Sequence, residues 1–472
     1  MKRFLLAALV TLVSFTSAEE KPNVLFIAID DLNAMIGALG GTPKALTPNI
    51  DRLAKRGILF SRAYCAAPAC NPSRTAVLTG MRPTTSGVYF NNQDWRESSR
   101  LKDIVTLPEH FRNHGYQVMG GGKLYHAASL SEKGHTGLLD GDSWDVYFPS
   151  KNQQLEKEAL PEKIPMNGSK EYYKGFFDWA ALDIADDEMG DAKVVSWASK
   201  QLSRVHDKPL FLGVGIYRPH IPFYTPKPYF DLYPEDELVL PGIVEGDLDD
   251  IPKAGQAMAR RDWHQWVEEN NQWKSFVRAY FASVSFADAM VGRLVDALDS
   301  GPNAGNTVVV LWSDHGYHLG HKEHWEKFAL WEQTTRVPLI FSAPGIEGGS
   351  VCHHPASLLD VYPTLAALTN TGVEPQWDGE SLVPFLKDPG AESNRAVVIT
   401  QGPGNHAVRS NSWRYIRYAD NTEELYDHEN DPDEFTNLAA LPGFEPVIRE
   451  HAVHLPESEA ELDPAARGKR KK

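Results

Sequence analysis

The run Asn-Val-Leu-Phe-Ile-Ala-Ile at residues 23–29 decides the class of fold. It is apolar almost without a break, a pattern typical of a strand that is buried on both faces of a sheet. Similar apolar runs occupy residues 116–119, 209–217 and 307–312, and helical patterns lie between the runs, at residues 48–56, 107–114 and 276–298. Because strands alternate with helices, we predict an α/β fold in which helices sandwich a large, mainly parallel sheet.

The pattern of apolar and polar residues along the chain changes after about residue 387. Short strand patterns at 396–400 and 413–418 precede an acidic, turn-rich run at 427–437. This pattern predicts a smaller C-terminal α+β subdomain. The predicted divisions are a signal peptide at 1–18, a large domain at 19–387, a small C-terminal subdomain at 388–460 and a basic tail at 461–472. Within the large domain, the polar and irregular stretch from about 140 to 174 is interpreted as a surface insertion.

The first eighteen residues have the pattern of an export signal. Lys2 and Arg3 precede a mainly apolar run at 4–15, and small residues at 16–18 end it. We therefore expect cleavage after Ala18 and a periplasmic or secreted protein. No later segment is long and apolar enough to suggest a membrane span.

The composition narrows the classes of function. The formal net charge is −16, which argues against a nucleic-acid partner, since such a protein needs a basic face. The 472 residues contain three cysteines, at positions 65, 70 and 352, too few for a disulfide framework. One disulfide is possible, and it would leave an odd thiol.

Chemically active side chains follow each predicted strand. The first is followed by Asp30 and Asp31, the second by Lys123 and His126, the third by Arg218 and His220, and the fourth by Asp314 and His315. In open parallel sheets, ligands bind outside the carboxyl ends of the strands. We therefore expect these side chains to meet at one edge of the sheet.

The carboxylates at this edge indicate a hard divalent cation. Asp30, Asp31 and Asp314 offer oxygen ligands, which suit calcium or magnesium. His318, His321 and His324 have a spacing that would place them on one face of a helix as zinc ligands. However, glycines at 316 and 320 disfavour a helix there, so surface or pocket-wall positions are the alternative.

The run Cys-Asn-Pro-Ser-Arg at residues 70–74 opens a predicted helix that ends near Thr79. Asn71 suits the N-cap and Pro72 the first helical position. Cys70 would then lie at a helix N-terminus, where free N–H groups and Arg74 favour an anion with tetrahedral oxygens. A thiolate nucleophile and a buried structural cysteine are both open alternatives.

With these motifs together, the sequence resembles the type I sulfatases of the alkaline-phosphatase-like superfamily. The resemblance rests on Cys-x-Pro-Ser-Arg at 70–74 with Thr-Gly at 79–80, and it extends over nearly the whole mature chain. Supporting motifs are at 23–31, 122–126, 218–220, 313–316 and 424–432. Within the family the sequence is most similar to the iduronate-2-sulfatases, on the basis of residues 88–96, the Lys123-x-x-His126 spacing, residues 219–223 and the pair Asp314-His315.

The resemblance implies a role for each matching residue. Cys70 would be converted to formylglycine by a formylglycine-generating or other sulfatase-maturing enzyme, and its hydrate would be the nucleophile, which would explain the odd thiol. One calcium ion per chain would be held by Asp30, Asp31, Asp314, His315 and an oxygen of the modified Cys70. Among the catalytic residues, Arg74 would orient the nucleophile, and Lys123 and Lys327 would bind sulfate. His126 would be the base that breaks down the sulfated intermediate, and His220 would be the acid that protonates the leaving alcohol. His315 departs from the Asn that is commoner in the family, and Lys322 is the alternative to Lys327.

The resemblance also implies a substrate class. We expect an exo-sulfatase that acts on a sulfated carbohydrate, such as glycosaminoglycan or algal polysaccharide fragments. The alternatives are an arylsulfatase or choline-sulfatase, a phosphodiesterase or phosphonate hydrolase of the same superfamily, and a non-catalytic glycan-binding relative. Trp95, Arg96, Tyr224 and His406 are candidates for the wall of a sugar site, although Trp and Tyr side chains more often serve packing.

Overall fold

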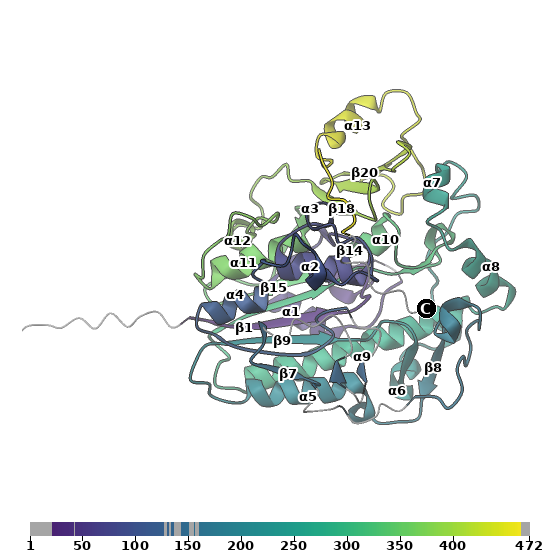
Figure 1. The fold of residues 1–472 in the computed structure, drawn as a ribbon. Helices are drawn as coiled ribbons and strands as arrows, with labels where there is room; N and C mark the ends of the chain where they lie inside the picture. The colour runs from purple at the N-terminus through teal and green to yellow at the C-terminus, as the bar shows by residue number, and fades with distance from the viewer. Residues whose placement is uncertain are drawn as a thin grey trace, which may run out of the picture.

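An eight-stranded sheet runs through the centre of the molecule in the order β16-β2-β15-β11-β1-β9-β4-β7 (Figure 1). The computed structural model describes residues 21–41, 43–126, 130–131, 134–135, 143–150, 155 and 160–463. The strands of this sheet are β1 (Asn23–Ile29), β2 (Ile58–Phe60), β4 (Gln117–Gly122), β7 (Val146–Phe148), β9 (Leu210–Ile216), β11 (Thr307–Ser313), β15 (Leu339–Ser342) and β16 (Ser350–Cys352). Strand β1 pairs in parallel with both β11 and β9, and β9 with β4. The predicted mainly parallel sheet is therefore confirmed, with β15 antiparallel to its neighbours β11 and β2.

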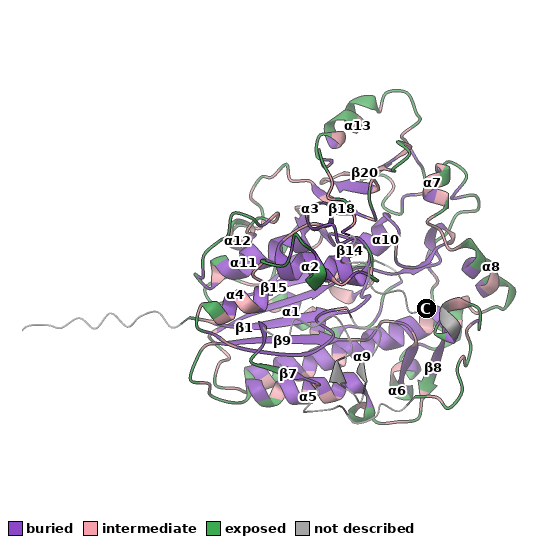
Figure 2. Cartoon of the chain, in the orientation of Figure 1, coloured by how far each residue is buried: buried purple, intermediate pink, exposed green. Residues whose placement is uncertain are grey.

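The alternating side chains of β1 face two separate hydrophobic cores. Leu25, Ile27 and Ile29 belong to one core, which is covered by α1 (Pro48–Arg56), α5 (Gly190–Leu202) and α9 (Trp273–Asp299). Val24, Phe26 and Ala28 belong to the other, covered by α2 (Cys70–Thr79), α4 (Leu107–Asn113) and α11 (Val361–Leu368). Figure 2 shows these central strands as buried along their length. A strand with two covered faces needs apolar residues at every position, which explains the unbroken run that predicted it.

The predicted surface insertion at 140–174 is wrong in one respect. Residues 146–148 form β7, an edge strand of the central sheet that pairs in parallel with β4. Three residues are too few to show a periodicity, so the polar surroundings hid the strand. Residues 140–142, 151–154 and 156–159 lie outside the described residues.

The C-terminal part contains a four-stranded antiparallel sheet and a helix. Its elements are β18 (Val397–Thr400), β19 (His406–Arg409), β20 (Trp413–Arg417), β21 (Glu423–Asp427) and α13 (Glu445–Ala452). The sequence analysis predicted β18 and β20 but missed β19 and β21. One face of this sheet packs against α13 through Val408, Tyr415 and Leu425, while Ala407 and Ile416 on the other face join a core of the large domain. The small subdomain is thus packed onto the large one rather than separate from it.

Shorter α-helices and strands also belong to the described fold. They are α3 (Pro83–Ser86), α6 (Lys227–Asp231), α7 (Lys253–Gln256), α8 (Arg261–Glu269), α10 (Glu332–Thr335), α12 (Val383–Lys387), β3 (Ala63–Tyr64), β5 (Leu130–Ser131), β6 (Gly134–His135), β8 (Trp179–Leu182), β10 (Phe223–Pro226), β12 (His318–Leu319), β13 (Trp325–Glu326), β14 (Arg336–Val337) and β17 (Ala356–Ser357).

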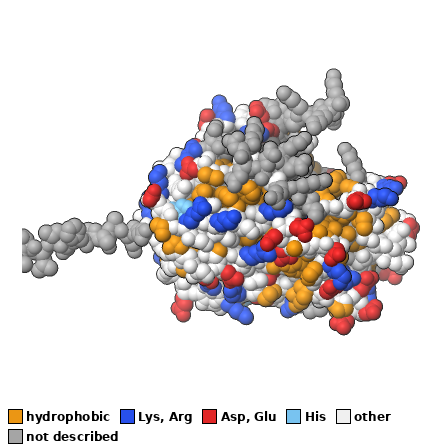
Figure 3. Space-filling model, turned by 90° about the horizontal axis from the view of Figure 1, so that it is seen from below, with side chains coloured by type: hydrophobic (Ala, Val, Ile, Leu, Met, Phe, Trp, Pro, Cys, Tyr) orange, Lys and Arg blue, Asp and Glu red, His pale blue; other side chains and the backbone are white. Residues whose placement is uncertain are grey.

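The remaining observations concern membrane-spanning segments, the surface and the ends of the chain. None of the helices among the described residues has the length and hydropathy needed to cross a bilayer. The face seen in Figure 3 carries basic and acidic side chains interspersed, with hydrophobic side chains between them. The predicted signal peptide at 1–18 and residues 464–472 of the predicted basic tail lie outside the described residues.

Candidate active site

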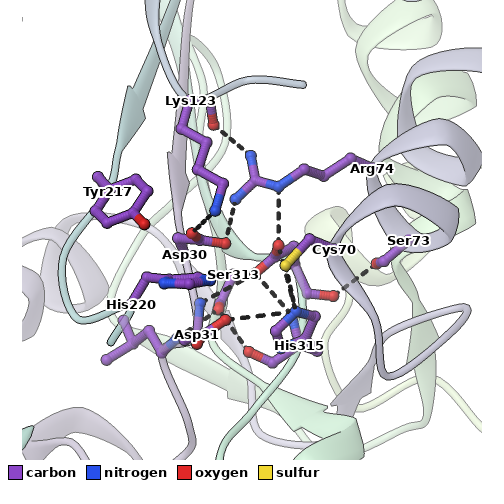
Figure 4. Close-up of polar contacts among 12 residues, drawn as sticks. Asp30, Asp31, Cys70, Ser73, Arg74, Lys123, Tyr217, His220, Ser313 and His315 are labelled. Carbon is purple, nitrogen blue, oxygen red and sulfur yellow. Dashed lines mark hydrogen bonds and ion pairs between the residues drawn. The ribbon is translucent and has the colours of Figure 1, made fainter. Parts of the chain in front are cut away.

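Four neighbouring strands deliver their following residues to one edge of the sheet (Figure 4). Asp30 and Asp31 follow β1, Lys123 follows β4, and Asp314 and His315 follow β11. His220 comes from the loop after β9. All of these except His220 are fully buried. Hydrogen bonds join residues that follow different strands, such as Asp31 with Asp314 and Lys123 with Asp30, and they confirm the prediction that the strand ends meet.

Asp31 lies in a backbone conformation that few non-glycine residues adopt. Its φ is 59°, in the left-handed region. The amide N–H of Asp31 donates to Oδ1 of Asp314 at 3.1 Å, and its carbonyl accepts from the Tyr280 hydroxyl at 2.8 Å. Such strained residues cluster at functional sites because the surrounding contacts hold them in place.

Two glycines bring Lys123 close to the neighbouring strand. A Cβ on Gly122, whose φ is 73°, would lie 1.9 Å from the carbonyl oxygen of Gly215. A Cβ on Gly215 would in turn lie 2.2 Å from the carbonyl carbon of Lys123. Only glycine at both positions permits this approach of β4 to β9.

Cys70 is the first residue of α2, whose N-cap is Ala69. The prediction that Asn71 caps the helix is therefore wrong. The Asn71 side-chain amide instead donates to the carbonyls of Phe90 (3.0 Å) and Gln93 (2.8 Å). The Asn side chain thus ties the loop around residue 90 to the start of the helix, which leaves the Cys70 side chain facing the sheet edge.

The Cys70 thiol is surrounded by cationic and imidazole groups. Lys327 Nζ lies 3.2 Å and His315 Nε2 lies 3.3 Å from Cys70 Sγ, and His126 is also hydrogen-bonded to Cys70. Burial by itself would raise the pKa of Cys70, but the charges of Lys327 and Lys123 outweigh burial and hold that pKa well below its usual value. The site is therefore built to hold negative charge at position 70.

Cys65 gives the contrast expected of a structural cysteine. It is as buried as Cys70, but burial and the charge of Asp314 raise its pKa far above the usual value. The three cysteines 65, 70 and 352 are free thiols, so the possible disulfide is absent among the described residues. The alternative of a buried structural cysteine thus fits Cys65 and does not fit Cys70.

Arg74 bridges two of the carboxylates. Its Nη2 donates to Asp30 Oδ1 at 2.9 Å, and its Nε donates to Asp314 Oδ2 at 2.8 Å. Nη1 donates to the main-chain carbonyls of Lys123 and Leu124. Because a buried charge is costly unless it is paired, these contacts fix the guanidinium and both carboxylates in one arrangement.

The two predicted sulfate-binding lysines both reach this cluster. Lys123 Nζ donates to Asp30 Oδ2, and Lys327 Nζ donates to Asp31 Oδ1 at 2.8 Å. Lys322, the alternative to Lys327, instead contacts Asp247 (2.8 Å) away from Cys70. The geometry therefore places Lys327, and not Lys322, beside Cys70.

The three histidines of the site have different orientations. Nδ1 of His315 lies 3.1 Å from the Gly316 carbonyl, which directs Nε2 to Cys70. Nδ1 of His220 lies 2.6 Å from the Ile221 carbonyl, which can only accept, so Nδ1 carries a hydrogen and Nε2 is left for proton exchange. His220 and His126 are half-buried, which gives both a route to a substrate.

The donor set fits a divalent cation. Ligand atoms of Asp30, Asp31, Cys70 and His315 all lie within 4.8 Å of one another, and Asp31 Oδ2 is buried without a hydrogen-bond partner among the described residues. Burial raises the pKa of the adjacent Asp314 to about 7, in spite of Arg74, and the charge of Asp30 adds to the rise. Crowded carboxylates of this kind favour a hard cation such as calcium. Asp314 falls outside the 4.8 Å group, and its Oδ2 lies 3.5 Å from His315 Nε2.

The second histidine cluster has no metal-binding geometry. His318, His321 and His324 are buried in and around the β12–β13 hairpin rather than on one face of an α-helix, and they form no group of converging ligand atoms in the described part of the chain. Both ring nitrogens of His324 already have partners, the Arg260 amide and the Lys327 carbonyl. The zinc alternative is therefore not supported.

The candidate sugar-site residues are mostly packing residues. Trp95 is buried and stacks on Tyr125 with ring centroids 5.8 Å apart, and the buried Tyr224 donates its hydroxyl to Asp178. His406 is buried and contacts Glu459 (2.7 Å) in the C-terminal part. Arg96 alone is exposed, in an ion pair of 2.7 Å with Asp94.

One residue at the site was missed from the sequence. Lys123 Nζ lies 4.6 Å from the centroid of the Tyr217 ring, and that ring lies 4.9 Å from His220 (Figure 4). Tyr217 is the residue directly after β9, so its place at the carboxyl end of a buried strand was the available signal.

Comparisons with known proteins identify the family of the chain. Residues 22–371 match the sulfatase family, and residues 320–461 match the family described as N-sulphoglucosamine sulphohydrolase, C-terminal. A sulfatase of Formosa agariphila is 37% identical over 94% of this chain and 88% of its own length. A choline-sulfatase of Rhizobium meliloti is 32% identical (89% and 83% covered), and the iduronate 2-sulfatase of Homo sapiens is 30% identical (76% and 71% covered).

A solved structure shares the fold. The structure of BT1596, described as a 2-O GAG sulfatase, superposes with a TM-score of 0.71 and 24% identity, covering 92% of this chain and 91% of that one. The family match spans most of the chain and includes every strand that contributes to the site. The chain therefore belongs to the type I sulfatases of the alkaline-phosphatase-like superfamily and is a sulfuric ester hydrolase.

Proposed function

We propose that this sulfatase releases sulfate from O-sulfated sugars, with formylglycine formed from Cys70 and one calcium ion per chain. The observation that carries the proposal is the position of Cys70, buried at the helix start within 3.3 Å of both Lys327 and His315. The calcium would be held by Asp30, Asp31, Asp314, His315 and the modified Cys70. When bound, calcium supplies positive charge for the sulfate oxygens, and formylglycine supplies a nucleophilic oxygen.

The chain's own lysines complete the sulfate site. Lys123 and Lys327 are both buried, and neighbouring negative charge outweighs burial and raises the pKa of each above its usual value. They therefore remain charged and can bind sulfate oxygens at any physiological pH. Arg74 stays fixed by Asp30 and Asp314, so in this proposal it orients residue 70 and does not move during turnover.

The two half-buried histidines would handle protons. Burial lowers the pKa of His126, so its imidazole is neutral and able to accept a proton beside residue 70. His220, with one hydrogen fixed on Nδ1, would act as the imidazolium: it would donate the proton on Nε2 to the departing sugar oxygen and remain as the neutral Nδ1–H form. A sugar alkoxide is a poor leaving group, so this donation would be needed for sugar sulfates.

The role of His220 predicts a dependence on the leaving group. His220→Gln is expected to lower kcat/KM for a sugar sulfate by about 10²- to 10⁴-fold, because protonation of the alkoxide is lost. For a nitrophenyl sulfate, whose phenolate leaves readily, the loss should be about tenfold or less. Steady-state kinetics on both substrates, with thermal unfolding as a control for folding, measure this difference. Equal losses on the two substrates would show that His220 is not the general acid.

The substrate class is tested by paired assays. From the similarity to iduronate 2-sulfatase, we expect oligosaccharides ending in a 2-O-sulfated uronic acid to be hydrolysed with kcat/KM about 100-fold above choline sulfate and nitrophenyl sulfate. Faster turnover of choline sulfate would favour the choline-sulfatase alternative, which the Rhizobium meliloti relative supports. Phosphate and phosphonate esters in the same assay test the remaining alternative, and their preferential hydrolysis would overturn the proposal.

Export and maturation belong to the same proposal. The pattern of residues 1–18 supports a periplasmic or secreted enzyme. A maturing enzyme would act on the Cys70 motif before or during folding, since Cys70 is fully buried in the folded chain.

A further inference from the structure

We infer that His324 is a positioning residue for Lys327, which it holds at the sulfate site through the Lys327 main-chain carbonyl. The inference rests on the proposed function, in which Lys327 binds sulfate. His324 Nε2 lies 3.0 Å from the Lys327 carbonyl oxygen, and His324 Nδ1 accepts from the main-chain N–H of Arg260 at 3.1 Å. Because a carbonyl only accepts, the hydrogen is on Nε2, and one neutral imidazole satisfies both contacts.

The backbone around Lys327 needs such support. Its two neighbours, Glu326 and Phe328, have φ values of 80° and 76°, in the left-handed region that non-glycine residues rarely adopt. Two such residues, one on each side of Lys327, cost free energy and persist only where contacts hold them. The Phe328 N–H donates to the Pro68 carbonyl at 3.0 Å, which holds one side of the turn, and His324 holds the other.

The His324 contact connects the turn to an outer layer of the molecule. Arg260 is the N-cap residue of α8, and its guanidinium lies 3.9 Å from Glu326 Oε2. His324 is fully buried, and burial, with the charge of Arg260 in addition, lowers its pKa to about 3. It therefore remains neutral at working pH. The imidazole thus acts as a fixed spacer between α8 and the lysine that lies 3.2 Å from Cys70.

Two substitutions separate the two contacts of His324. The amide of Asn can replace Nδ1 and accept from Arg260, but it is too short to reach Lys327, whereas Gln can replace Nε2 and donate to the Lys327 carbonyl. Each variant keeps one buried hydrogen bond and loses one, so the two are matched in stability. We expect His324→Asn to lower kcat/KM for sulfate esters about tenfold or more through misplacement of Lys327, and His324→Gln to lower it about threefold or less. His321→Asn is the control, because its ring lies 6.0 Å from that of His318 in the same cluster, and it should keep activity within about twofold.

A double-mutant cycle decides between positioning and general destabilisation. In the Lys327→Ala background, His324→Asn should cost less than about twofold, because the lysine to be positioned is gone. Thermal unfolding is measured for every variant. An unchanged tenfold loss in that background, or equal losses for Asn and Gln at position 324, would overturn the inference while the proposed function stands. A wild-type protein that releases no sulfate from any ester would overturn the proposed function, and the inference with it.

Discussion

Replacing Cys70 by Ala is expected to lower sulfate release by about 10⁴-fold or more, because the substitution removes the precursor of the nucleophile while the binding groups remain. Lys327 and His315 would then face a methyl group instead of the group that they contact at 3.2 and 3.3 Å. The measurement is kcat on the best sulfated sugar, with inorganic sulfate as the product detected. The fold should survive, since the change removes a single buried sulfur atom and leaves the backbone and the ion pairs of the site in place.

Cys65 provides the matched control. It is equally buried, precedes the same helix and has a pKa raised by burial, so it has the features of a packing residue. Cys65→Ala should therefore keep activity within about threefold, with a loss of stability of about 1 kcal/mol. If Cys70→Ala retained wild-type sulfate release, or if both variants lost activity equally, the assignment of Cys70 would be wrong.

Removal of divalent cations is also expected to have a large effect. Chelation should lower activity by about 100-fold or more, and added calcium should restore it, because the crowded carboxylates would lose the cation that they share and the sulfate oxygens would lose its positive charge. Calcium should also raise the melting temperature by several degrees, since an ion that binds only the folded state stabilises it.

Asp31→Asn tests whether the effect comes from this site. The substitution keeps the size of the side chain but removes the charge of the carboxylate whose Oδ2 has no hydrogen-bond partner among the described residues. The calcium-dependent rise in melting temperature should disappear in this variant. Full activity after chelation, with metal analysis confirming that no divalent ion remains, would contradict the assignment.

The placement of the site could be predicted from the sequence because parallel strands impose it. The run at 23–29 is buried on both faces, so nearly every position is apolar, and the strand can be recognised from this one sequence. Its carboxyl end must lie beside the ends of β9 and β11, which brings Asp30, Asp31 and Asp314 together. The choice of Lys327 over Lys322 came from family resemblance, and here the geometry agrees with it.

The parts that could not be predicted depend on contacts between distant residues. Asn71 looked like a helix cap, but it bonds to the carbonyls of Phe90 and Gln93, which no local pattern reveals. His406 looked free to bind sugar, but Glu459, fifty-three residues further on, occupies its ring nitrogen. Strand β7 has only three residues and obtains its stability from β4 rather than from its own sequence.

The account's central claim is that Cys70 becomes formylglycine, and one measurement tests it most directly. Trypsin should release residues 63–74 as a single peptide that contains both Cys65 and Cys70. In active protein isolated from its native source and treated with a thiol-alkylating reagent, we predict a peptide mass with formylglycine at position 70 and one alkyl group, on Cys65. A spectrum of fully active material in which both cysteines are alkylated would contradict the account.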